Sequence, residues 1–504
     1  MKKIFIIIVC ILIILGGIFL TKNQSEKKFN YEIQEINEYN YFVYKENEFF
    51  GVINKEGKTI VSAKFQNVII PNPEKDIFIC YNEEKPEVLN SNGEKLFTEY
   101  DEVEPIKLKS SASTLAYEKS VLKYKKDGLY GLINFQGKSL TKNIYSTIEN
   151  LEPTEGKLLV SKENKQGVID IKANKLVDVK YDKVVSDEYF TIENEYKKSG
   201  FLVSIKKDDG YKFGYVDYKG KTILNSEYNE IERIPNKNDK ITLIVSNNGK
   251  YGLYKKSKKI IDTEFQSIVY DENLNLLIVQ KNKKFGVYSL EGKKIIEPNK
   301  EEISSRGIYL YVKSQDGNKV YDEKGKEVDI NYNRSIYKTE NDEYRISTIL
   351  NNNITYYGII NKEQAQLVQE KYRYIEYLYN NYFIATNDEG DLGVINNNGK
   401  VVLDMKYNLL QKIKGMNIVQ AGIQNSNKIE FYSQEMKKVL EVENPNIELK
   451  KDYVIISNEN QKSFLDKNGN EIKDVQNLEK SYFPDKVGEY KKMQITIDTL
   501  YYIK

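Results

Sequence analysis

Short apolar runs alternate with polar turn residues along almost the whole chain, and only the N-terminus has a long continuous apolar period. A typical stretch is the apolar run 158–161, the polar residues 162–165 and the Gly-Val-Ile-Asp sequence at 167–170. Two β-rich runs around such a turn predict a hairpin. An apolar pair after the next turn, such as Ile60 and Val61, predicts a third strand, and residues 65–69 predict a fourth extended piece. We therefore predict an all-β fold.

One motif recurs within this pattern. It consists of an aromatic residue, Gly, two apolar residues, Asn or Asp, two free positions and Gly-Lys, as in residues 50–58, 130–138 and 213–221. The motif returns every 33 to 47 residues, which indicates a repeat architecture. Its leading glycine is found at eight places: Gly51, Gly131, Gly167, Gly214, Gly252, Gly286, Gly358 and Gly393.

The repeat count follows from the spacing of these glycines. Degenerate copies at 88–93 and 320–326 fill the two long gaps, and further copies lie at 464–469 and near residues 431–432, which gives about twelve units. An aromatic residue fourteen positions after the leading glycine confirms the register in six copies, namely Phe65, Tyr145, Tyr181, Tyr228, Tyr372 and Tyr407. In the copy that begins at Gly252, Phe265 comes thirteen positions later.

The array predicted from these units spans residues 29–476, and residues 477–504 form a C-terminal strand cap in which 494–503 is one more strand. We expect an open superhelical stack of β-hairpins, because each unit of such an array contacts mainly its neighbours. One or two β-propellers are the alternative, since units of about four strands also suit propeller blades.

Each motif position has a turn or packing interpretation. Asn or Asp at its fifth position can bond back to the backbone of a tight turn, and the following Gly can adopt a left-handed conformation. The leading glycine inside a strand indicates that another backbone or a ring packs closely on it. Reading the Asp and Asn side chains as a row of ligands is the less favoured alternative; they are Asn54, Asn134, Asp170, Asp217, Asn361 and Asn396.

These motifs resemble the WG repeat of bacterial proteins, in which a Trp-Gly pair opens the same stretch. The resemblance covers residues from about 40 to 475, although every leading Trp is replaced by Phe, Tyr, Leu or a polar residue. It implies a β-rich repeat array, often outside the membrane, for which binding is proposed more often than catalysis.

The sequence of the N-terminus predicts a membrane-spanning segment. Lys2 and Lys3 precede an uncharged run from Ile4 to Leu20, which as a helix is about 26 Å long, at the short end of what spans a bilayer. No small-residue cleavage site follows it. We predict an uncleaved signal anchor in residues 1–28 with its span at 4–20, and export of the remaining chain. A secreted protein is the alternative.

Composition and net charge limit the kinds of partner, catalytic site and metal site that the chain can have. The formal net charge of +2 argues against nucleic acid as the partner. Because the chain has no His, it excludes a Ser-His-Asp triad and a His-containing metal site. Cys80 follows an apolar run and reads as a buried strand thiol. We predict no metal, no cofactor and no catalytic residue.

The function that these features favour is a non-enzymatic binding scaffold at the cell surface, with a protein or a cell-wall polymer as partner. A sensory or assembly subunit of a membrane complex is the alternative, and an unrecognised hydrolase with an acidic cleft is a third hypothesis. The chain holds 41 Tyr residues, and those outside the periodic positions are the candidates for an exposed binding strip, namely Tyr374, Tyr377, Tyr379 and Tyr382.

Overall fold

The computed structural model describes residues 38–83, 85–108, 117–152, 156–190, 196–235, 241–423, 426–450, 452–473, 486–494 and 500–503. Within these ranges the chain forms 48 β-strands in twelve sheets and no α-helix, which confirms the all-β prediction. No helix among these residues has the length and apolar character needed to cross a membrane. The predicted span 4–20 lies outside the described residues.

The chain divides into two compact units, one made of Met1–Leu243 with Ser481–Lys504 and the other of Ile244–Lys480. In the first sheet of the first unit, the spatial order of the strands is β3 (Thr59–Phe65), β2 (Phe49–Asn54), β1 (Tyr41–Glu46), β48 (Leu500–Ile503), β47 (Tyr490–Gln494) and β46 (Lys486–Val487). The next two sheets have the strand orders β4 (Asn67–Ile69), β5 (Phe78–Tyr81), β6 (Glu87–Leu89) and β7 (Lys95–Leu96), and β10 (Leu129–Asn134), β9 (Val121–Lys126) and β8 (Glu102–Glu104). Two further sheets have the strand orders β11 (Thr147–Glu152), β12 (Lys157–Lys162), β13 (Lys165–Asp170) and β14 (Lys175–Tyr181), and β15 (Lys183–Phe190), β16 (Tyr196–Lys207), β17 (Gly210–Asp217) and β18 (Thr222–Tyr228). The next sheet in the chain consists of β19 (Glu230–Arg233), β20 (Thr242–Asn247), β21 (Lys250–Lys255) and β22 (Lys258–Phe265).

The sheets of the second unit are β23 (Ser267–Asp271), β24 (Leu276–Lys281), β25 (Lys284–Ser289) and β26 (Lys294–Lys300); β27 (Glu302–Arg306), β28 (Tyr309–Ser314), β29 (Gly317–Tyr321) and β30 (Glu327–Val328); β31 (Arg334–Lys338), β32 (Tyr344–Asn351), β33 (Ile354–Asn361) and β34 (Gln366–Tyr372); β35 (Tyr374–Tyr379), β36 (Tyr382–Thr386), β37 (Leu392–Asn396) and β38 (Val401–Tyr407); β39 (Leu409–Lys412), β40 (Val419–Gly422), β41 (Lys428–Tyr432) and β42 (Lys438–Glu443); and β43 (Asn446–Leu449), β44 (Tyr453–Ser457) and β45 (Lys462–Asp466).

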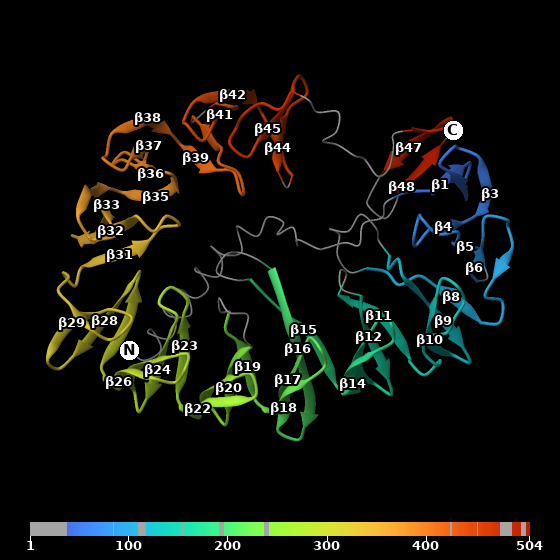
Figure 1. Cartoon of the computed structure of the whole chain (residues 1–504), viewed down its shortest axis with the longest axis horizontal. Coiled ribbons are helices and arrows are strands. Elements are labelled where there is room, and N and C mark those ends of the chain that lie inside the picture. The colour runs from blue at the N-terminus through green and yellow to red at the C-terminus, as the bar shows by residue number, and fades with distance from the viewer. Residues whose placement is uncertain are drawn as a thin grey trace. The chain divides into compact units, whose positions relative to one another are not determined.

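In a four-stranded sheet the strands follow chain order, and we call them the first to fourth strand; Figure 1 shows β15 to β18 arranged in this way. In the four-stranded sheets that carry it, the motif glycine lies in the third strand, as Gly167 lies in β13. The periodic aromatic residue ends the fourth strand, as Tyr181 ends β14, and the next sheet begins two residues later. The extended piece predicted after the aromatic residue therefore belongs to the following sheet.

The two adjacent apolar residues of the motif face opposite sides of their strand, because side chains alternate along a strand. Val168 packs with Val203 and Val216 of the following sheet. Its neighbour Ile169 packs with Val121 and Leu132 of the preceding sheet. The core here therefore lies between successive sheets, and the sheet of β11 to β14 is covered on both faces.

The Asn and Asp side chains of the motif close turns between the third and fourth strands. Oδ1 of Asn54 accepts hydrogen bonds from the backbone N–H groups of Glu56 and Lys58 at 3.2 and 2.9 Å. Gly57 sits in this turn with a φ of 80°. The same pair of bonds recurs at Asn134, Asp170, Asp217 and Asn396, and Asn361 makes one of them. The predicted turn role is confirmed, and these oxygens do not form a row of free ligands.

The C-terminal segment differs from the prediction of one strand over 494–503. β47 ends at Gln494 and β48 begins at Leu500, and these two residues pair with each other in an antiparallel hairpin. The apolar alternation of the segment continues through the connection, so the sequence pattern alone reads as one strand.

Candidate functional site

The leading glycines lie against the backbone of the fourth strand or against a ring. A Cβ built at Gly51 would lie 2.3 Å from the carbonyl oxygen of Val61, and one built at Gly358 would lie 2.5 Å from that of Val368. Gly167, Gly214, Gly252, Gly286 and Gly393 have equally close backbone neighbours, while Gly131 lies under the ring of Tyr124. Only a residue without a Cβ fits there.

Each periodic aromatic residue lies opposite the residue that precedes the leading glycine. Phe50 pairs with Phe65 across β2 and β3, and the register shifts twice between Phe50 and Ile53. The other pairs are Tyr130 with Tyr145, Gln166 with Tyr181, Phe213 with Tyr228, Tyr357 with Tyr372 and Leu392 with Tyr407. Five of these six periodic rings are buried, and Tyr228 is half-buried. Their positions serve packing between sheets.

The shorter spacing at Phe265 has a local cause. Tyr251 pairs with Phe265 in the same way, but the turn between their two strands, β21 and β22, is closed by the pair Lys255 and Lys258. In other copies that turn is one residue longer, as in the bond from the N–H of Asn54 to the carbonyl of Lys58.

The four non-periodic tyrosines do not form one exposed strip, which corrects the prediction. Tyr374 is 43% exposed and its ring centroid lies 5.4 Å from that of Tyr357, whereas Tyr377 packs 5.5 Å from Phe383. Tyr379 is only 6% exposed, and its ring lies 6.3 Å from that of Tyr382. The reason is the alternation of side chains along β35, together with a bulge between Tyr377 and Tyr379.

Sequence reasoning missed what replaces the leading glycine in the degenerate copies. Three residues before the turn residue, these copies carry Glu87, Lys319, Glu430 and Ser463. The first three each form an ion pair with the residue eight positions later, on the fourth strand: Glu87 with Lys95 at 2.8 Å, Lys319 with Glu327 at 2.8 Å and Glu430 with Lys438 at 3.1 Å. These substitutes can be found in the sequence by aligning each degenerate copy on its turn residue.

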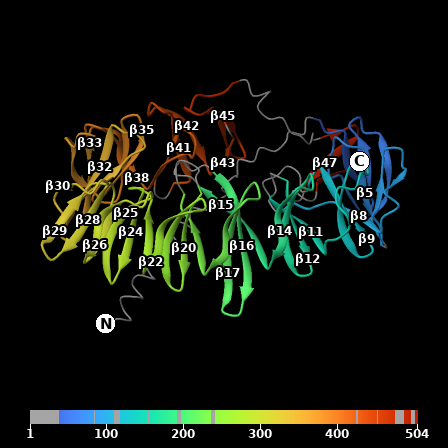
Figure 2. The same ribbon diagram turned by 60° about the horizontal axis from the view of Figure 1, so that its bottom comes forward.

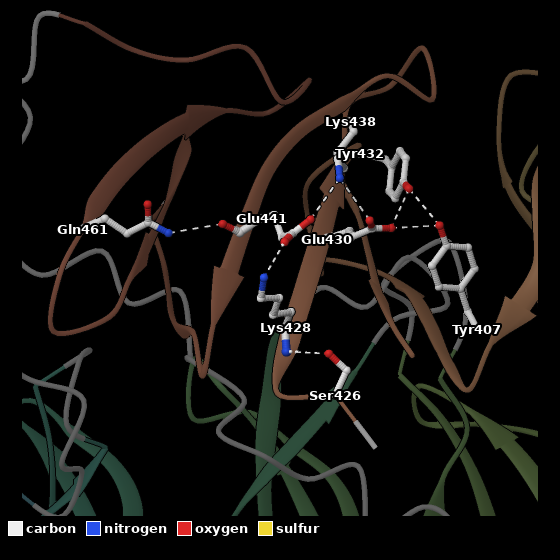
Figure 3. A network of polar contacts seen from close by, with 8 residues as sticks. All are labelled: Tyr407, Ser426, Lys428, Glu430, Tyr432, Lys438, Glu441 and Gln461. Atoms are coloured by element: carbon white, nitrogen blue, oxygen red, sulfur yellow. Dashed lines mark hydrogen bonds and ion pairs between the residues drawn. The ribbon is translucent and has the colours of Figure 1, made fainter. Parts of the chain in front are cut away.

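Glu430 is the most buried of the three substitutes that form ion pairs, and it is surrounded by polar groups (Figure 3). Its side chain is 18% exposed. The hydroxyls of Tyr407 and Tyr432 lie 2.8 and 2.7 Å from Oε2 of Glu430, and 2.8 Å from each other. The two hydroxyl groups therefore have two hydrogen atoms to donate, although three oxygen–oxygen contacts are present. Tyr407, the periodic aromatic of one sheet, is in this way bound to the next sheet.

The electrostatics of this cluster favour fixed protonation states. Burial raises the pKa of Glu430, but the hydrogen bonds from Tyr432, Tyr407 and Lys438 outweigh it, so that the net pKa is lowered. Burial, as the largest cause, raises the pKa of Tyr407 and of Tyr432. At neutral pH the carboxylate accepts hydrogen bonds and both phenols donate, so the cluster joins two sheets rather than exchanging protons.

A second polar cluster lies in the first unit. Oδ2 of Asp187 accepts hydrogen bonds from Ser199, at 2.5 Å, and from the hydroxyl of Tyr215. Nε of Arg233 lies 3.7 Å from the same oxygen, and its side chain is 4% exposed. Burial, followed by the charge of Asp187, raises the pKa of Tyr215. This cluster holds β15, β16, β17 and β19 together.

Cys80 is fully buried in β5, as predicted, and burial raises the pKa of its thiol to about 12. Among the described residues, no group of three or more His, Cys, Asp or Glu side chains is placed to hold a metal ion.

Comparison with known proteins supports the repeat assignment. A family model described as WG containing repeat matches residues 50–72 and 213–251, which confirms the resemblance to WG repeats in these two regions. No curated protein matches the sequence.

Many solved structures are similar to the chain, and three of them illustrate the likeness. A crystal structure of the eukaryotic initiation factor has 10% identity and a TM-score of 0.31 over 70% of this chain and 94% of that one. Kluyveromyces lactis Hsv2 has 12% identity and a TM-score of 0.21 over 40% and 73%. The extracellular domain of a putative one component system from B. thetaiotaomicron has 8% identity and a TM-score of 0.19 over 88% and 78%. At such low scores these likenesses decide neither fold nor function.

Proposed function

We propose that this chain is a non-catalytic binding scaffold. An N-terminal helix at 4–20 holds it in the membrane as a single-pass protein, and the β-array lies outside the cytoplasm. A secreted form is the alternative. The partner is a protein or a cell-wall polymer. The array itself is proposed as an open stack of its hairpin units, with a β-propeller as the alternative.

The observation that carries the proposal is a set of exposed apolar side chains on hairpins of the first unit. Phe49, Leu129 and Tyr211 are 46%, 39% and 50% exposed. Each lies at the turn between the second and third strand of its sheet, where it pairs with Glu46, Lys126 and Lys206, respectively. Figure 2 shows one of these hairpins, β16–β17, whose turn projects at one end of its sheet.

These side chains have no role in forming their turns. The left-handed residues Asn47, Asp127, Gly128 and Gly210 make the reversals. Burying a large apolar side chain contributes about 1.5–3 kcal/mol, and aromatic residues dominate binding energy at protein interfaces. Three such side chains on separate hairpins of one unit therefore support contact with an extended partner rather than with a small molecule.

A binding assay with a matched control tests the proposal. The exported part would be mixed with purified cell-wall material and with a membrane-protein library, as wild type and as the triple variant Phe49→Ser, Leu129→Ser and Tyr211→Ser. We expect the triple variant to bind at least about tenfold more weakly. The control, Val269→Ser with Leu350→Ser, changes similarly exposed apolar residues of the second unit and should bind like the wild type.

Two outcomes would contradict the scaffold. If the wild type binds neither wall material nor any membrane protein, the scaffold function is contradicted. If the triple variant binds as well as the wild type, these hairpin side chains are not the binding surface. Constant co-purification with one membrane complex would favour the sensory or assembly alternative instead.

A further inference from the structure

Among the described residues, the sheet of the first repeat has no first strand from its own repeat, and β48 lies in that place. In other sheets, the residue opposite the leading glycine pairs on its far side with a buried Ile or Val of the first strand. Val160, for example, lies between Gly167 and Ile148. Equivalent rows are Val184–Val203–Gly214, Ile268–Val279–Gly286, Ile336–Ser347–Gly358 and Ile375–Ala385–Gly393.

In the first repeat the place of the buried Ile or Val is taken by Tyr502. Tyr44 lies opposite Gly51, and on its other side it pairs with Tyr502 of β48. Tyr502 is fully buried. β48 runs parallel to β1, whereas the first strands of the equivalent rows are antiparallel to their second strands. A segment from far along the chain therefore completes the first sheet.

Side chains provide most of the contact between this segment and the first repeat. Only Tyr44 with Tyr502 and Lys45 with Ile503 are paired along the backbone. The ring centroids of Phe42 and Tyr502 are 5.3 Å apart, those of Tyr44 and Tyr490 are 5.2 Å apart, and those of Phe50 and Tyr501 are 5.6 Å apart. Val487 joins the same buried cluster as Ile53.

The turn of the segment also fits the first repeat. A Cβ built at Gly57 would lie 2.9 Å from Cα of Gly488, and one built at Gly488 would lie 3.1 Å from Cα of Gly57. In several later repeats, the equivalent turn glycine lies against the fourth strand of the preceding sheet: Gly220 against Leu176, Gly292 against Ile260 and Gly325 against Ile295. Residues 486–494 and 500–503 thus take the place of a preceding sheet as well as of a first strand.

We propose that the first repeat is a strand-acceptor site, and that residues 486–503 of a second copy of this chain dock in it in exchange for the chain's own segment. An exposed strand edge is a template for an added strand. The contacts are the same whichever copy supplies the segment, so the choice depends on the effective concentration of each. Assembly of copies through this site goes beyond binding at the hairpins.

Disulfide trapping in the full chain tests the exchange. Lys45→Cys and Ile503→Cys would be introduced together with Cys10→Ser, and two differently tagged copies would be mixed in detergent, partly unfolded, refolded and oxidised. We expect disulfides both within one copy and between tags, with the fraction between tags rising about in proportion to protein concentration. Disulfides only within one copy at every concentration would overturn the exchange, and none of either kind would overturn the docking site.

Two further variants separate docking from chance collision. Lys491 pairs with Ile503 on the strand beyond β48, so a cysteine at 491 in place of 503 is out of disulfide reach of position 45. This variant should form a disulfide neither within one copy nor between tags. Cross-linking equal to that of the 45 and 503 pair would mean that the disulfides form by chance collision. Adding Tyr502→Ala to the cysteine pair should reduce both products several-fold, whereas Met493→Ala, at a 39% exposed side chain, should change neither.

Discussion

A Cβ built at position 131 would lie 2.4 Å from Cζ of Tyr124, so the tyrosine ring covers the leading glycine of its own repeat. Tyr124 and Gly131 are cross-strand partners in β9 and β10. In the first repeat, Tyr44 takes the same place opposite Gly51, but the nearest atom to a Cβ there is the carbonyl oxygen of Val61, at 2.3 Å. The nearest atoms to a Cβ at position 131 all belong to the Tyr124 side chain, whereas a Cβ at position 51 would meet backbone atoms as well as the Tyr44 ring, which lies 2.6 Å away.

Alanine at these glycines should separate the two causes. Gly131→Ala should destabilise the fold by about 1–3 kcal/mol through overpacking, and adding Tyr124→Ala should recover part of that loss because the ring is removed. Gly51→Ala should cost more, and Tyr44→Ala should not recover it, since the Val61 carbonyl remains. Urea unfolding of the four variants measures the couplings. Equal coupling in both repeats would contradict the distinction.

Turn positions occupied by a residue other than glycine offer a second test. Ala173 and Met436 stand where other repeats have Gly57 or its equivalents, with φ values of 66° and 60°. Left-handed backbone costs a residue with a Cβ about 1 kcal/mol, so Ala173→Gly should stabilise the protein by about that amount.

Met436→Gly at the same turn position is the matched comparison. It relieves the same strain but removes a side chain that is only 7% exposed, and should be net destabilising by about 1–3 kcal/mol. Both changes would be measured as shifts of the urea midpoint. A destabilising Ala173→Gly would show that its methyl packing outweighs the strain.

The lowered pKa of Glu430 makes stability depend on acid pH. A carboxyl whose folded pKa lies below its ordinary value of 4.5 contributes stability above that value and loses it as pH falls through the folded pKa. The protection factors of the β41 and β42 amides, which correct hydrogen exchange for its pH-dependent intrinsic rate, should therefore fall below pH 4.5 in the wild type, and Glu430→Gln should remove this acid-dependent step.

Tyr432→Phe provides the control for that experiment. It removes one hydrogen bond to the carboxylate and keeps the ring, so the acid-dependent step should move to higher pH rather than vanish. An unchanged pH profile in both variants would show that another carboxyl causes the loss.

Arg306 should resist replacement by lysine. Its guanidinium carbon lies 3.5 Å from the ring centroid of Tyr311 and 5.0 Å from that of Tyr332, and it donates a hydrogen bond to the Tyr332 carbonyl at 2.9 Å. The planar guanidinium can lie on the Tyr311 ring and donate to the Tyr332 carbonyl at the same time, and a compact ammonium cannot, so Arg306→Lys should cost about 1–2 kcal/mol. Arg373→Lys, at 5.5 Å from Tyr356 and with a 37% exposed side chain, should cost less than about 0.5 kcal/mol. Thermal unfolding compares the two, and equal costs would exclude the contact with Tyr311 as the cause.

The sequence predicts local geometry well because its repeat is local. The Asn54 turn and the strand around Gly51 are recognised from residue types at fixed spacing, and the structure agrees with both. The fourteen-residue interval to Phe65 was visible as well. Its cause, the pairing of Phe50 with Phe65 across a shifted register, was not, because a spacing does not reveal which residues are partners.

Relationships between distant residues account for what the sequence did not reveal. Nothing near Tyr44 indicates that its neighbour is Tyr502, since the pairing depends on where the chain returns. The Glu430 cluster is assembled from Tyr407 of one sheet and Tyr432 and Lys438 of the next. Its chemistry becomes visible only when Glu430 is recognised as the substitute for a glycine.

The position of Tyr502 in the first sheet also sets the order of events during synthesis. At roughly 5–20 residues per second, Tyr502 leaves the ribosome tens of seconds after its partner Tyr44. During that time the aromatic surface around Phe42 and Tyr44 has no β48 to cover it. A chain that is translocated while it is synthesised would carry this aromatic surface uncovered until β48 has followed it.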